Sequence, residues 1–353
     1  MRLHILIGGA GFLGRHLVED LVKEGGSTEN WFLIIDRFEA NDLMRDLYIS
    51  SESNVTFLDC NLEESSLWDE YGYYRTKDYE DKFDSIYIYH FASPVGVVNH
   101  KESTFYRAMY INQNVYHFAK NFQIFTKPIN SKERDLKFFY MSSSEIYGPI
   151  NENTLTPRLD TFANLHENLG GFRSDYIYQK VLGEELFRQL PGRYGVVILR
   201  LFNIVGKYQD PTKGVFNKFI DNIVHNLVCE INDSIRSYTP YSIFTETMFA
   251  YIFRDVTGIV TTNVCSPDFG LSMTTEELYM YLHQYLITHY NCISGENKNF
   301  TYINMEGEIK YRGSTNTISY REFVNNFGWI IDEYMVWAHT EKSRKNHIPE
   351  VKK

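Results

Sequence analysis

The sequence of 353 residues predicts an α/β protein, with a doubly wound parallel sheet and a smaller second lobe toward the C-terminus. Over residues 1–205, short apolar runs rich in β-branched residues alternate with segments of helical periodicity. A turn with four glycines in seven positions joins the first apolar run to the first helical segment, in LHILIGGAGFLGRHLVEDLV, residues 3–22. Strands that alternate with helices form a parallel sheet covered on both faces, so these two patterns predict the fold class.

Each element is predicted from its own stretch of sequence. Apolar runs predict strands at 3–7, 31–38, 54–62, 83–94, 136–148 and 195–206. Apolar residues at helical spacing predict helices that begin at Phe12 and that span 102–122, 174–190 and 274–290. Asn, Thr and Pro predict a loop at 149–173.

The pattern becomes mixed beyond residue 205. We therefore expect one domain over residues 1–205 and a smaller, mainly substrate-binding lobe over 206–340, which could return elements to the sheet. The last stretch, HTEKSRKNHIPEVKK, is rich in charge, and we expect residues 341–353 to fray as a tail.

Composition excludes several classes of function. A net charge of −10 argues against a nucleic-acid or anionic-membrane surface. Cys60, Cys229, Cys265 and Cys292 are widely spaced without a CxxC pair, so we expect reduced thiols, and the eleven histidines show no clustering that predicts a metal site. Glycines interrupt the N-terminal apolar run, and no apolar stretch reaches 18 residues, so we expect neither a signal peptide nor a membrane span. A cytoplasmic protein is the expectation.

The glycine turn predicts a site for a dinucleotide. Gly9-x-Gly11-x-x-Gly14 and Gly8-x-x-Gly11-x-x-Gly14 both lie between a strand and a helix, where phosphate meets bare backbone N–H groups and the positive end of the helix dipole. A purely structural turn is the alternative.

An acidic residue after the second strand supports the dinucleotide interpretation. Asp36 ends that strand 22 residues after Gly14, where a carboxylate bonds both hydroxyls of an adenosine ribose and repels a 2′-phosphate. This predicts NAD, although the adjacent Arg37 leaves NADP open. Asp59, at the next strand end, could accept from the adenine amino group or could simply be a turn residue.

Two further motifs suggest proton transfer. Tyr176-x-x-x-Lys180 places both side chains on one face of a helix, where the ammonium lowers the pKa of the phenol so that it can take a proton from a substrate hydroxyl. In YMSSSEIYG, Ser142–Ser144 and Glu145 follow a strand, at the edge where doubly wound folds bind ligands. An ordinary helix face and a serine-rich turn are the alternatives.

Together these motifs resemble the extended short-chain dehydrogenase/reductases, the NAD-dependent nucleotide-sugar epimerase and dehydratase family. The resemblance covers residues 1–205, in the order ILIGGAGFLG, FLDCNL, YHFASPVGV, YMSSSEIYG, RSDYIYQK and RLFNIVG. It implies a Rossmann fold with a C-terminal substrate lobe, and a homodimer packed through 102–122 and 174–190.

The resemblance also implies roles for individual residues. NAD would be bound by Gly8, Gly11, Phe12, Leu13, Gly14, Asp36, Asp59, Cys60, Ala92, Tyr176 and Lys180. The catalytic residues would be Ser143, Glu145, Tyr176 and Lys180, with Ser143 bonding the reacting oxygen of the sugar. The nucleotide-sugar substrate would be contacted by Ser144, Arg173 and Asn203.

The resemblance leaves several reactions open after oxidation of the sugar at C4. A 4,6-dehydratase needs a carboxylate to remove the C5 proton, and a decarboxylase loses CO₂ and then returns a proton to C5. Glu145 stands where both kinds of enzyme carry a glutamate. The motifs YHFASP and RSDYIYQK, with Arg173 three residues before the tyrosine, are most similar to UDP-glucuronate decarboxylases. These chemistries are favoured over a 4-epimerase, in which Glu145 would merely cap the turn.

Some positions depart from the family pattern. Ile7 replaces the usual threonine and Lys207 follows Gly206, where the pattern has Gly-Pro. The expected Gly-rich strand with a diphosphate-binding arginine is not evident in the second half: Met248 stands near the expected place, and Arg236 or Arg254 could substitute. A non-catalytic NAD-binding regulator or scaffold is therefore the alternative of another class.

Overall fold

The computed structural model describes residues 1–37, 54–74, 82–94, 102–125, 135–147, 172–232, 234–266, 271–290, 300–302, 311–312 and 317–345. These residues form two compact units. The first takes the described residues up to Leu201 and then Thr245–Val264. The second takes Phe202–Phe244 and the described residues from Cys265 onward.

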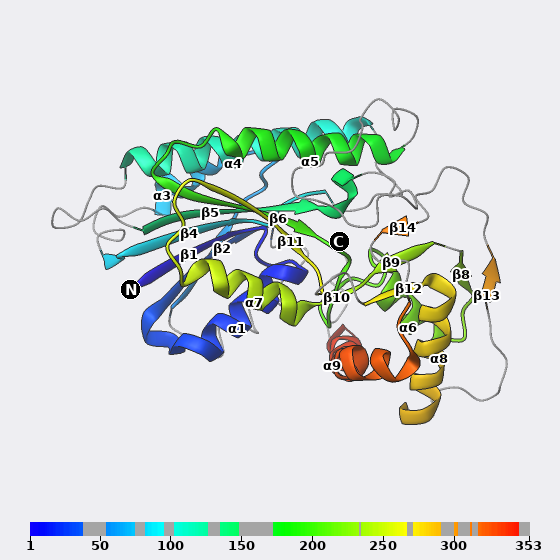
Figure 1. The fold of residues 1–353 in the computed structure, drawn as a ribbon. Helices are drawn as coiled ribbons and strands as arrows, with labels where there is room; N and C mark the ends of the chain where they lie inside the picture. Colours follow the sequence, from blue (N-terminus) through cyan, green and yellow to red (C-terminus); the bar gives the residue numbers. More distant parts are fainter. Residues whose placement is uncertain are drawn as a thin grey trace, which may run out of the picture. The chain divides into compact units, whose positions relative to one another are not determined.

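The first unit is built on one seven-stranded parallel sheet (Figure 1). From one edge to the other, its strands are β11 (Ile259–Val264), β6 (Tyr194–Leu201), β5 (Asp135–Ser143), β4 (Ser85–His90), β1 (Arg2–Ile7), β2 (Asn30–Asp36) and β3 (Val55–Asp59). The chain runs outward from β1 through β2 to β3, and then outward on the other side through β4, β5 and β6. The strand order therefore reverses beside β1, which is where open α/β sheets bind ligands.

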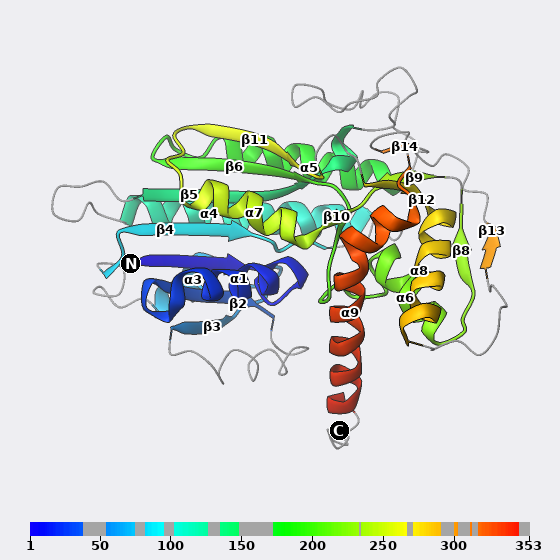
Figure 2. The same cartoon turned by 60° about the horizontal axis from the view of Figure 1, so that its bottom comes forward.

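Helices cover both faces of this sheet (Figures 1 and 2). One face carries α3 (Leu67–Tyr74), α4 (Glu102–Phe125) and α5 (Phe172–Arg188), and the other carries α1 (Phe12–Glu29) and the part of α7 (Tyr241–Ile252) from Thr245 on. The core under α4 and α5 joins Leu3 and Ile5 of β1 to Phe118 of α4 and Phe187 of α5. Burial on both faces explains why these strands are continuous apolar runs.

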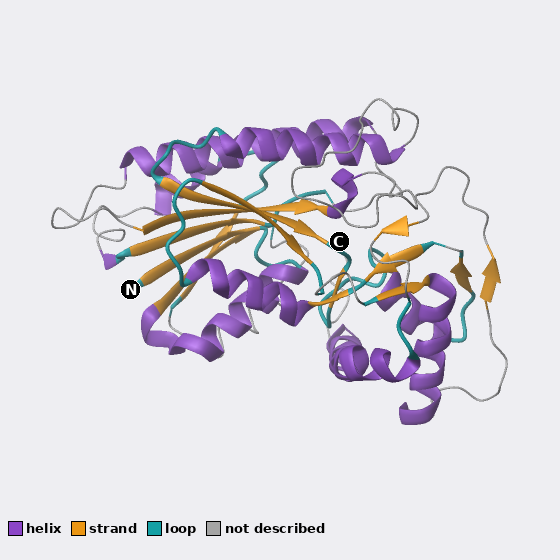
Figure 3. Ribbon diagram, in the orientation of Figure 1, coloured by secondary structure: helices purple, strands orange, loops and turns teal. Residues whose placement is uncertain are grey.

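The second unit combines helices with short strand pairs (Figure 3). Its described helices are α6 (Val215–Val224), α8 (Thr275–Tyr290) and α9 (Tyr320–Lys345). Its described strands are β7 (Ile204–Val205) paired with β10 (Thr239–Pro240), β8 (Cys229–Ile231) with β13 (Phe300–Tyr302), and β9 (Ile235–Ser237) with β12 (Ser272–Thr274) and β14 (Tyr311–Arg312). Aromatic side chains including Phe216, Phe323 and Phe327 form its core.

The fold class and the predicted strands are confirmed, with differences at their ends. The 136–148 run becomes β5 followed by a 3₁₀ turn, η3 (Ser144–Tyr147), and 195–206 divides into β6 and β7. The strand β11 was not predicted, because IVTTNV is half polar and lies at the sheet edge. The predicted loop at 149–173 lies almost wholly outside the described residues.

At the C-terminal end, α9 continues to Lys345, whereas a frayed tail was expected from residue 341. The residues Glu341 to Lys345 include good helix formers, which let the helix continue. Among the described helices, none has the length and apolar character needed to cross a bilayer.

Candidate functional site

The predicted site residues follow strands whose carboxyl ends lie at one edge of the sheet. Ile7, the last residue of β1, pairs in register with His90 at the end of β4. His90 pairs with Tyr140 of β5, three residues before Ser143. Because the strands are parallel, the glycine turn and the serine turn both emerge at this edge.

The glycine turn after β1 has a backbone that only glycine adopts easily. Gly8 has a φ of +79°, and its carbonyl accepts a 3.2 Å hydrogen bond from the N–H of Gly11. A methyl group on Gly8 would lie only 2.7 Å from Cα of Ala92. The N–H of Ala92 in turn donates a hydrogen bond to the carbonyl of Ile7 at 2.9 Å. The glycine turn therefore packs closely against the segment that follows β4.

The start of α1 leaves backbone donors for an anion. Gly11 caps the helix without a side-chain hydrogen bond, and the first turn holds no acidic residue. The N–H groups of Phe12, Leu13 and Gly14 have no earlier helical turn to bond, and the helix dipole is positive here. A methyl on Gly14 would lie 2.7 Å from Cα of Gly9, so the close approach of the turn to the helix needs glycine. This is a cradle suited to a diphosphate.

Asp36 lies beside this cradle. Its Oδ2 accepts from the N–H of Ala10 at 3.0 Å, and its Oδ1 accepts from the N–H of Arg37 at 2.8 Å. Burial raises the pKa of this carboxyl, and the two backbone hydrogen bonds oppose that shift. Each oxygen keeps a second lone pair, so the carboxylate can still accept from two hydroxyl groups, as a ribose requires.

Asp59 is the last residue of β3, next to Asp36, and Cys60 follows it. Asp59 pairs in register with Asp36, and the N–H of Cys60 donates to the carbonyl of Asp36 at 3.0 Å. Burial raises the pKa of the Cys60 thiol to about 12, so it stays a neutral packing group. The exposed Asp59 is at the edge where an adenine would extend, and its contact with adenine stays a prediction.

Lys180 joins α5 to the end of β5. Its Nζ donates to the carbonyl of Met141 at 3.0 Å. The same nitrogen lies 5.7 Å from the ring centre of Tyr176 and 5.6 Å from that of Tyr140. Burial lowers the pKa of Lys180 to about 8, and the carboxylate of Glu184 opposes that shift. The structure thus brings Tyr176 and Lys180 to the strand that ends in the serine turn.

The first half of α5 is also hydrogen-bonded to the segment after β4. Gln179 donates from Nε2 to the hydroxyl of Ser93 at 2.8 Å. Arg173, predicted to contact substrate, belongs to the first turn of α5, and its side chain lies outside the part of the chain that the structure describes.

The three serines at the end of β5 have different surroundings. Ser143 accepts a 3.2 Å hydrogen bond from the N–H of Glu145, which leaves its own hydroxyl proton available for an oxygen of a substrate. Ser144 and Glu145 are buried in η3, with Glu145 only 7% exposed. Ser142 donates its hydroxyl to Glu184 at 2.6 Å, so it is already engaged within the protein.

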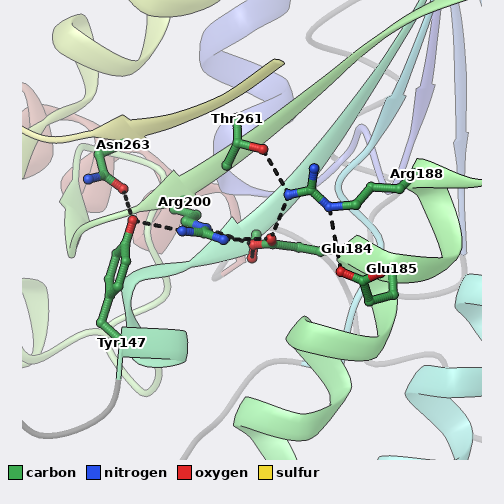
Figure 4. Close-up of polar contacts among 8 residues, drawn as sticks. Tyr147, Glu184, Glu185, Arg188, Arg200, Thr261 and Asn263 are labelled. Atoms are coloured by element: carbon green, nitrogen blue, oxygen red, sulfur yellow. Dashed lines mark hydrogen bonds and ion pairs between the residues drawn. The ribbon is translucent and has the colours of Figure 1, made fainter. Parts of the chain in front are cut away.

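Sequence reasoning missed two charged residues near this turn. Glu184 and Arg200 are fully buried and paired at 2.9 Å (Figure 4). The signal was present, because Arg200 interrupts the apolar run GVVILRLFN, and a buried charge needs a partner.

In the second unit, Asn203 lies next to a strand that carries an arginine. Asn203 has a φ of +24° and donates from Nδ2 to the carbonyl of Ser237 in β9 at 2.9 Å. Arg236 precedes Ser237 in this strand, and its Cα pairs with that of Arg312 in β14. Arg236, named from the sequence as a possible substitute for the diphosphate-binding arginine, thus lies on a short strand next to Asn203.

The other candidate, Arg254, is on the wrong edge of the sheet. Its guanidinium lies 4.0 Å from the ring centre of Tyr251, near the C-terminal end of α7. The neighbouring Phe253 lies under Arg2, at the amino end of β1. Met248 is fully buried within α7. The role of either arginine in binding a diphosphate stays a prediction.

A family model for the NAD-dependent epimerase/dehydratase family matches residues 4–240. No curated protein matches this sequence.

Solved structures of nucleotide-sugar enzymes share the fold. dTDP-glucose 4,6-dehydratase from Bacillus anthracis, a complex with NAD, has a TM-score of 0.66 and 15% identity, over 97% of this chain and 98% of that one. UDP-glucose 4-epimerase from Thermus thermophilus, also with NAD, has a TM-score of 0.65 and 18% identity, over 95% and 99%. UDP-glucuronic acid 4-epimerase from Bacillus cereus, with UDP-glucuronic acid and NAD, has a TM-score of 0.64 and 18% identity, over 95% and 99%.

Proposed function

The chain belongs to the NAD-dependent epimerase/dehydratase family, and we propose that it oxidises a nucleotide-linked sugar at C4 and then eliminates water or CO₂ from the 4-keto sugar. NAD, when bound, supplies the hydride acceptor for the oxidation and the hydride donor for any later reduction. Three features of the first unit and one of the second support this assignment.

The cofactor cradle fits a dinucleotide diphosphate. Side chains at Gly8 and Gly14 would collide with the backbone of Ala92 and Gly9, so this compact turn needs glycine, and the N–H groups at the start of α1 favour an anion. Asp36 retains acceptor capacity for ribose hydroxyls, and its negative charge disfavours a 2′-phosphate, so NAD fits better than NADP.

Tyr176 would remove the proton from the C4 hydroxyl. The nearby ammonium of Lys180 favours the phenolate, and a phenolate accepts a proton from a hydroxyl held against it. Ser143 would hold the same sugar oxygen through its free hydroxyl proton. In this arrangement the chain orients the hydroxyl and takes its proton.

Glu145 is the residue that leads us to favour elimination or decarboxylation over epimerisation. The hydroxyl of Ser143 accepts from the N–H of Glu145 and so caps the turn. Glu145 is 7% exposed and lies in the turn at the ligand-binding edge of the sheet, where a carboxylate can serve as a general acid or base. Next to a 4-keto sugar, it would remove or return the proton at C5.

Asn203 and Arg236 would hold the diphosphate of the nucleotide sugar. Asn203 is hydrogen-bonded to β9, the strand that carries Arg236, so the two positions are coupled. A guanidinium is the side chain best suited to two phosphate oxygens at once.

The proposed enzyme is a homodimer formed through α4 and α5. These helices lie side by side on one face of the sheet (Figure 1). Tyr106 and Tyr110, one turn apart on α4, are 62% and 48% exposed, and Leu182 of α5 is 42% exposed. Exposed apolar side chains on paired helices favour burial against a second copy.

We place the enzyme in the cytoplasm. Cys60 and Cys229 are buried free thiols, and burial raises the pKa of each, to about 12 and about 11. Reduced, unpaired cysteines are typical of a reducing compartment.

The test is to incubate the protein and NAD with UDP-, GDP-, dTDP- and CDP-sugars and to measure the masses of the products by mass spectrometry. Loss of one water supports a 4,6-dehydratase, and loss of CO₂ from a uronic acid supports a decarboxylase. An isomer of unchanged mass would make the protein a 4-epimerase and Glu145 a turn residue. Bound NAD without turnover of any sugar would favour a non-catalytic role.

Glu145→Gln separates these outcomes further. The variant keeps the turn, because the hydrogen bond from the N–H of residue 145 to Ser143 is retained. We expect oxidation at C4 to continue and product formation to fall by a factor of roughly 10² to 10⁴. Unchanged product formation would contradict the role of this carboxylate.

A further inference from the structure

A buried ion pair lies next to the turn that carries Ser143 and Glu145. Glu184 of α5 and Arg200 of β6 are both fully buried. Arg200 donates from Nε to Oε1 at 3.0 Å and from Nη2 to Oε2 at 2.9 Å (Figure 4). Two parallel hydrogen bonds fix the planes of both groups, so the pair is a rigid unit.

This pair is bonded to both ends of the turn. At the beginning, Ser142 donates its hydroxyl to Oε1 of Glu184 at 2.6 Å. At the end, the hydroxyl of Tyr147 accepts from Nη1 of Arg200 at 3.0 Å and donates to Oδ1 of Asn263 in β11 at 2.6 Å. The residues between these two anchors include Ser143 and Glu145.

The same pair is also anchored to the helix that carries Tyr176 and Lys180. Glu184 follows Lys180 by one turn of α5. One turn further, Arg188 approaches Glu184 at 3.4 Å and donates to the hydroxyl of Thr261 in β11 at 2.9 Å. The ion pair thus connects α5, the end of β5, β6 and β11.

A buried ion pair adds little net stability relative to apolar side chains, because both charges lose their hydration. Its rigid geometry is the property that remains. We propose that Glu184 and Arg200 are positioning residues, which fix the turn from Ser143 to Tyr147 at a set distance from Tyr176. This inference rests on the proposed roles of Ser143 and Tyr176.

Two variants test the proposal by kinetics. Glu184→Gln keeps the side-chain shape and removes the charge, and we expect kcat for oxidation to fall roughly 100-fold, because small displacements of reacting groups have effects of this size. Tyr147→Phe removes only the hydroxyl at the end of the turn, and we expect a loss of about tenfold. The KM should stay within about twofold in both variants, because the groups proposed to hold the nucleotide diphosphate are unchanged.

The pH profile separates positioning from a merely structural role. The charge of Glu184 opposes the effect of burial on the pKa of Lys180. Its removal should move the upper limb of the kcat profile to lower pH, since the other groups facing Lys180 are unchanged: Tyr176 on α5, Tyr140 on β5 and His90 on β4. A structural role alone would lower the melting temperature and leave this limb in place.

Glu185→Gln is the matched control. It is the same substitution at the next residue of α5, where the side chain is 57% exposed and pairs with Arg188 at 3.6 Å. We expect wild-type kcat and an unchanged pH profile. A loss equal to that of Glu184→Gln would overturn the proposal.

Crystal structures of the wild type and Glu184→Gln with NAD give a readout that does not depend on activity. We expect the turn to shift by about 0.5 Å or more relative to Tyr176, the tolerance of a catalytic constellation. An unmoved turn would refute the positioning role. If the wild type turned over no nucleotide sugar, the proposed function would fail, whereas this structural comparison would still decide the positioning. Tyr147→Phe serves in the same way if Glu184→Gln does not fold.

Discussion

Replacing Gly14 by alanine is the most direct test of the dinucleotide cradle. The added methyl would lie 2.7 Å from Cα of Gly9 and closer still to the carbonyl oxygen of Gly9, where ordinary van der Waals contact begins at 3.4 Å. Because both partners are backbone, the turn must move by more than about 0.7 Å from the start of α1. Backbone donors displaced by this distance no longer make good hydrogen bonds to phosphate.

The magnitude follows from the bonds that are lost. A hydrogen bond to a charged group contributes about 1.5–3 kcal/mol, so loss of one raises the Kd for NAD by a factor of roughly 10 to 100. Isothermal titration calorimetry of Gly14→Ala with NAD measures this change in Kd. A thermal melt measures the loss of stability that comes from the displaced turn.

Gly72→Ala is the control for the same substitution. Gly72 lies in α3, and a methyl there would meet nothing within 4 Å. We expect unchanged NAD affinity and a stability gain of up to about 1 kcal/mol, because alanine favours the helix. If Gly14→Ala bound NAD as tightly as Gly72→Ala does, the assignment of the cradle would be wrong.

Three further predictions concern the substrate and the proton. Tyr176→Phe should lower kcat by a factor of roughly 10² to 10⁴ and leave the Kd for NAD unchanged, as steady-state rates and titration would show; full activity would exclude the phenol as the base. Arg236→Ala should raise the KM for a nucleotide sugar by roughly 10- to 100-fold, since a charged hydrogen bond is lost, whereas Arg254→Ala at the other edge should change neither KM nor kcat. Because burial lowers the pKa of Lys180 to about 8, the ammonium is present below that pH, and kcat should fall as the pH rises through it; a profile that stays flat to about pH 10, near the ordinary lysine value, would contradict this.

The linked effect on stability has the opposite sign. The pKa of Lys180 is lower in the folded protein than in the unfolded chain, so between about 8 and the ordinary lysine value the unfolded chain binds more protons. The free energy of unfolding therefore gains from this group as the pH rises through that window. Activity and stability should diverge there, which separates titration of Lys180 from general alkaline unfolding.

The cofactor half of the site could be predicted from the sequence because its information is local. Gly8, Gly11 and Gly14 are contiguous with a strand and a helix, and Asp36 follows at a spacing set by one helix and one strand. The glycines are required by the backbone geometry of the turn, and Asp36 is required for its charge. Both requirements can be recognised from residues close together in the chain. The sequence therefore predicts the cradle in detail.

The proposed substrate half could not be predicted in the same way, because its information lies in pairings between distant segments. Arg236 lies on a three-residue strand, too short for any periodic signal, and that strand exists because it pairs with β12 and β14. The strand β11 is likewise half polar and forms at the edge by pairing with β6. Tertiary contacts decide these elements, and local propensity does not.

The buried charges depend both on the local sequence and on contacts between distant segments. Arg200 is visible in the sequence as a charge inside an apolar strand, but its partner is fixed only when α5 packs on β5, where a methyl on Gly183 would collide with the ring of Tyr140. That close approach brings Glu184 to Arg200 and Lys180 to the end of β5 through one packing contact. The helix that carries the proposed base is therefore positioned by the same contact that completes the ion pair. A change that loosens this packing should disturb both the proton transfer and the turn that holds the sugar oxygen.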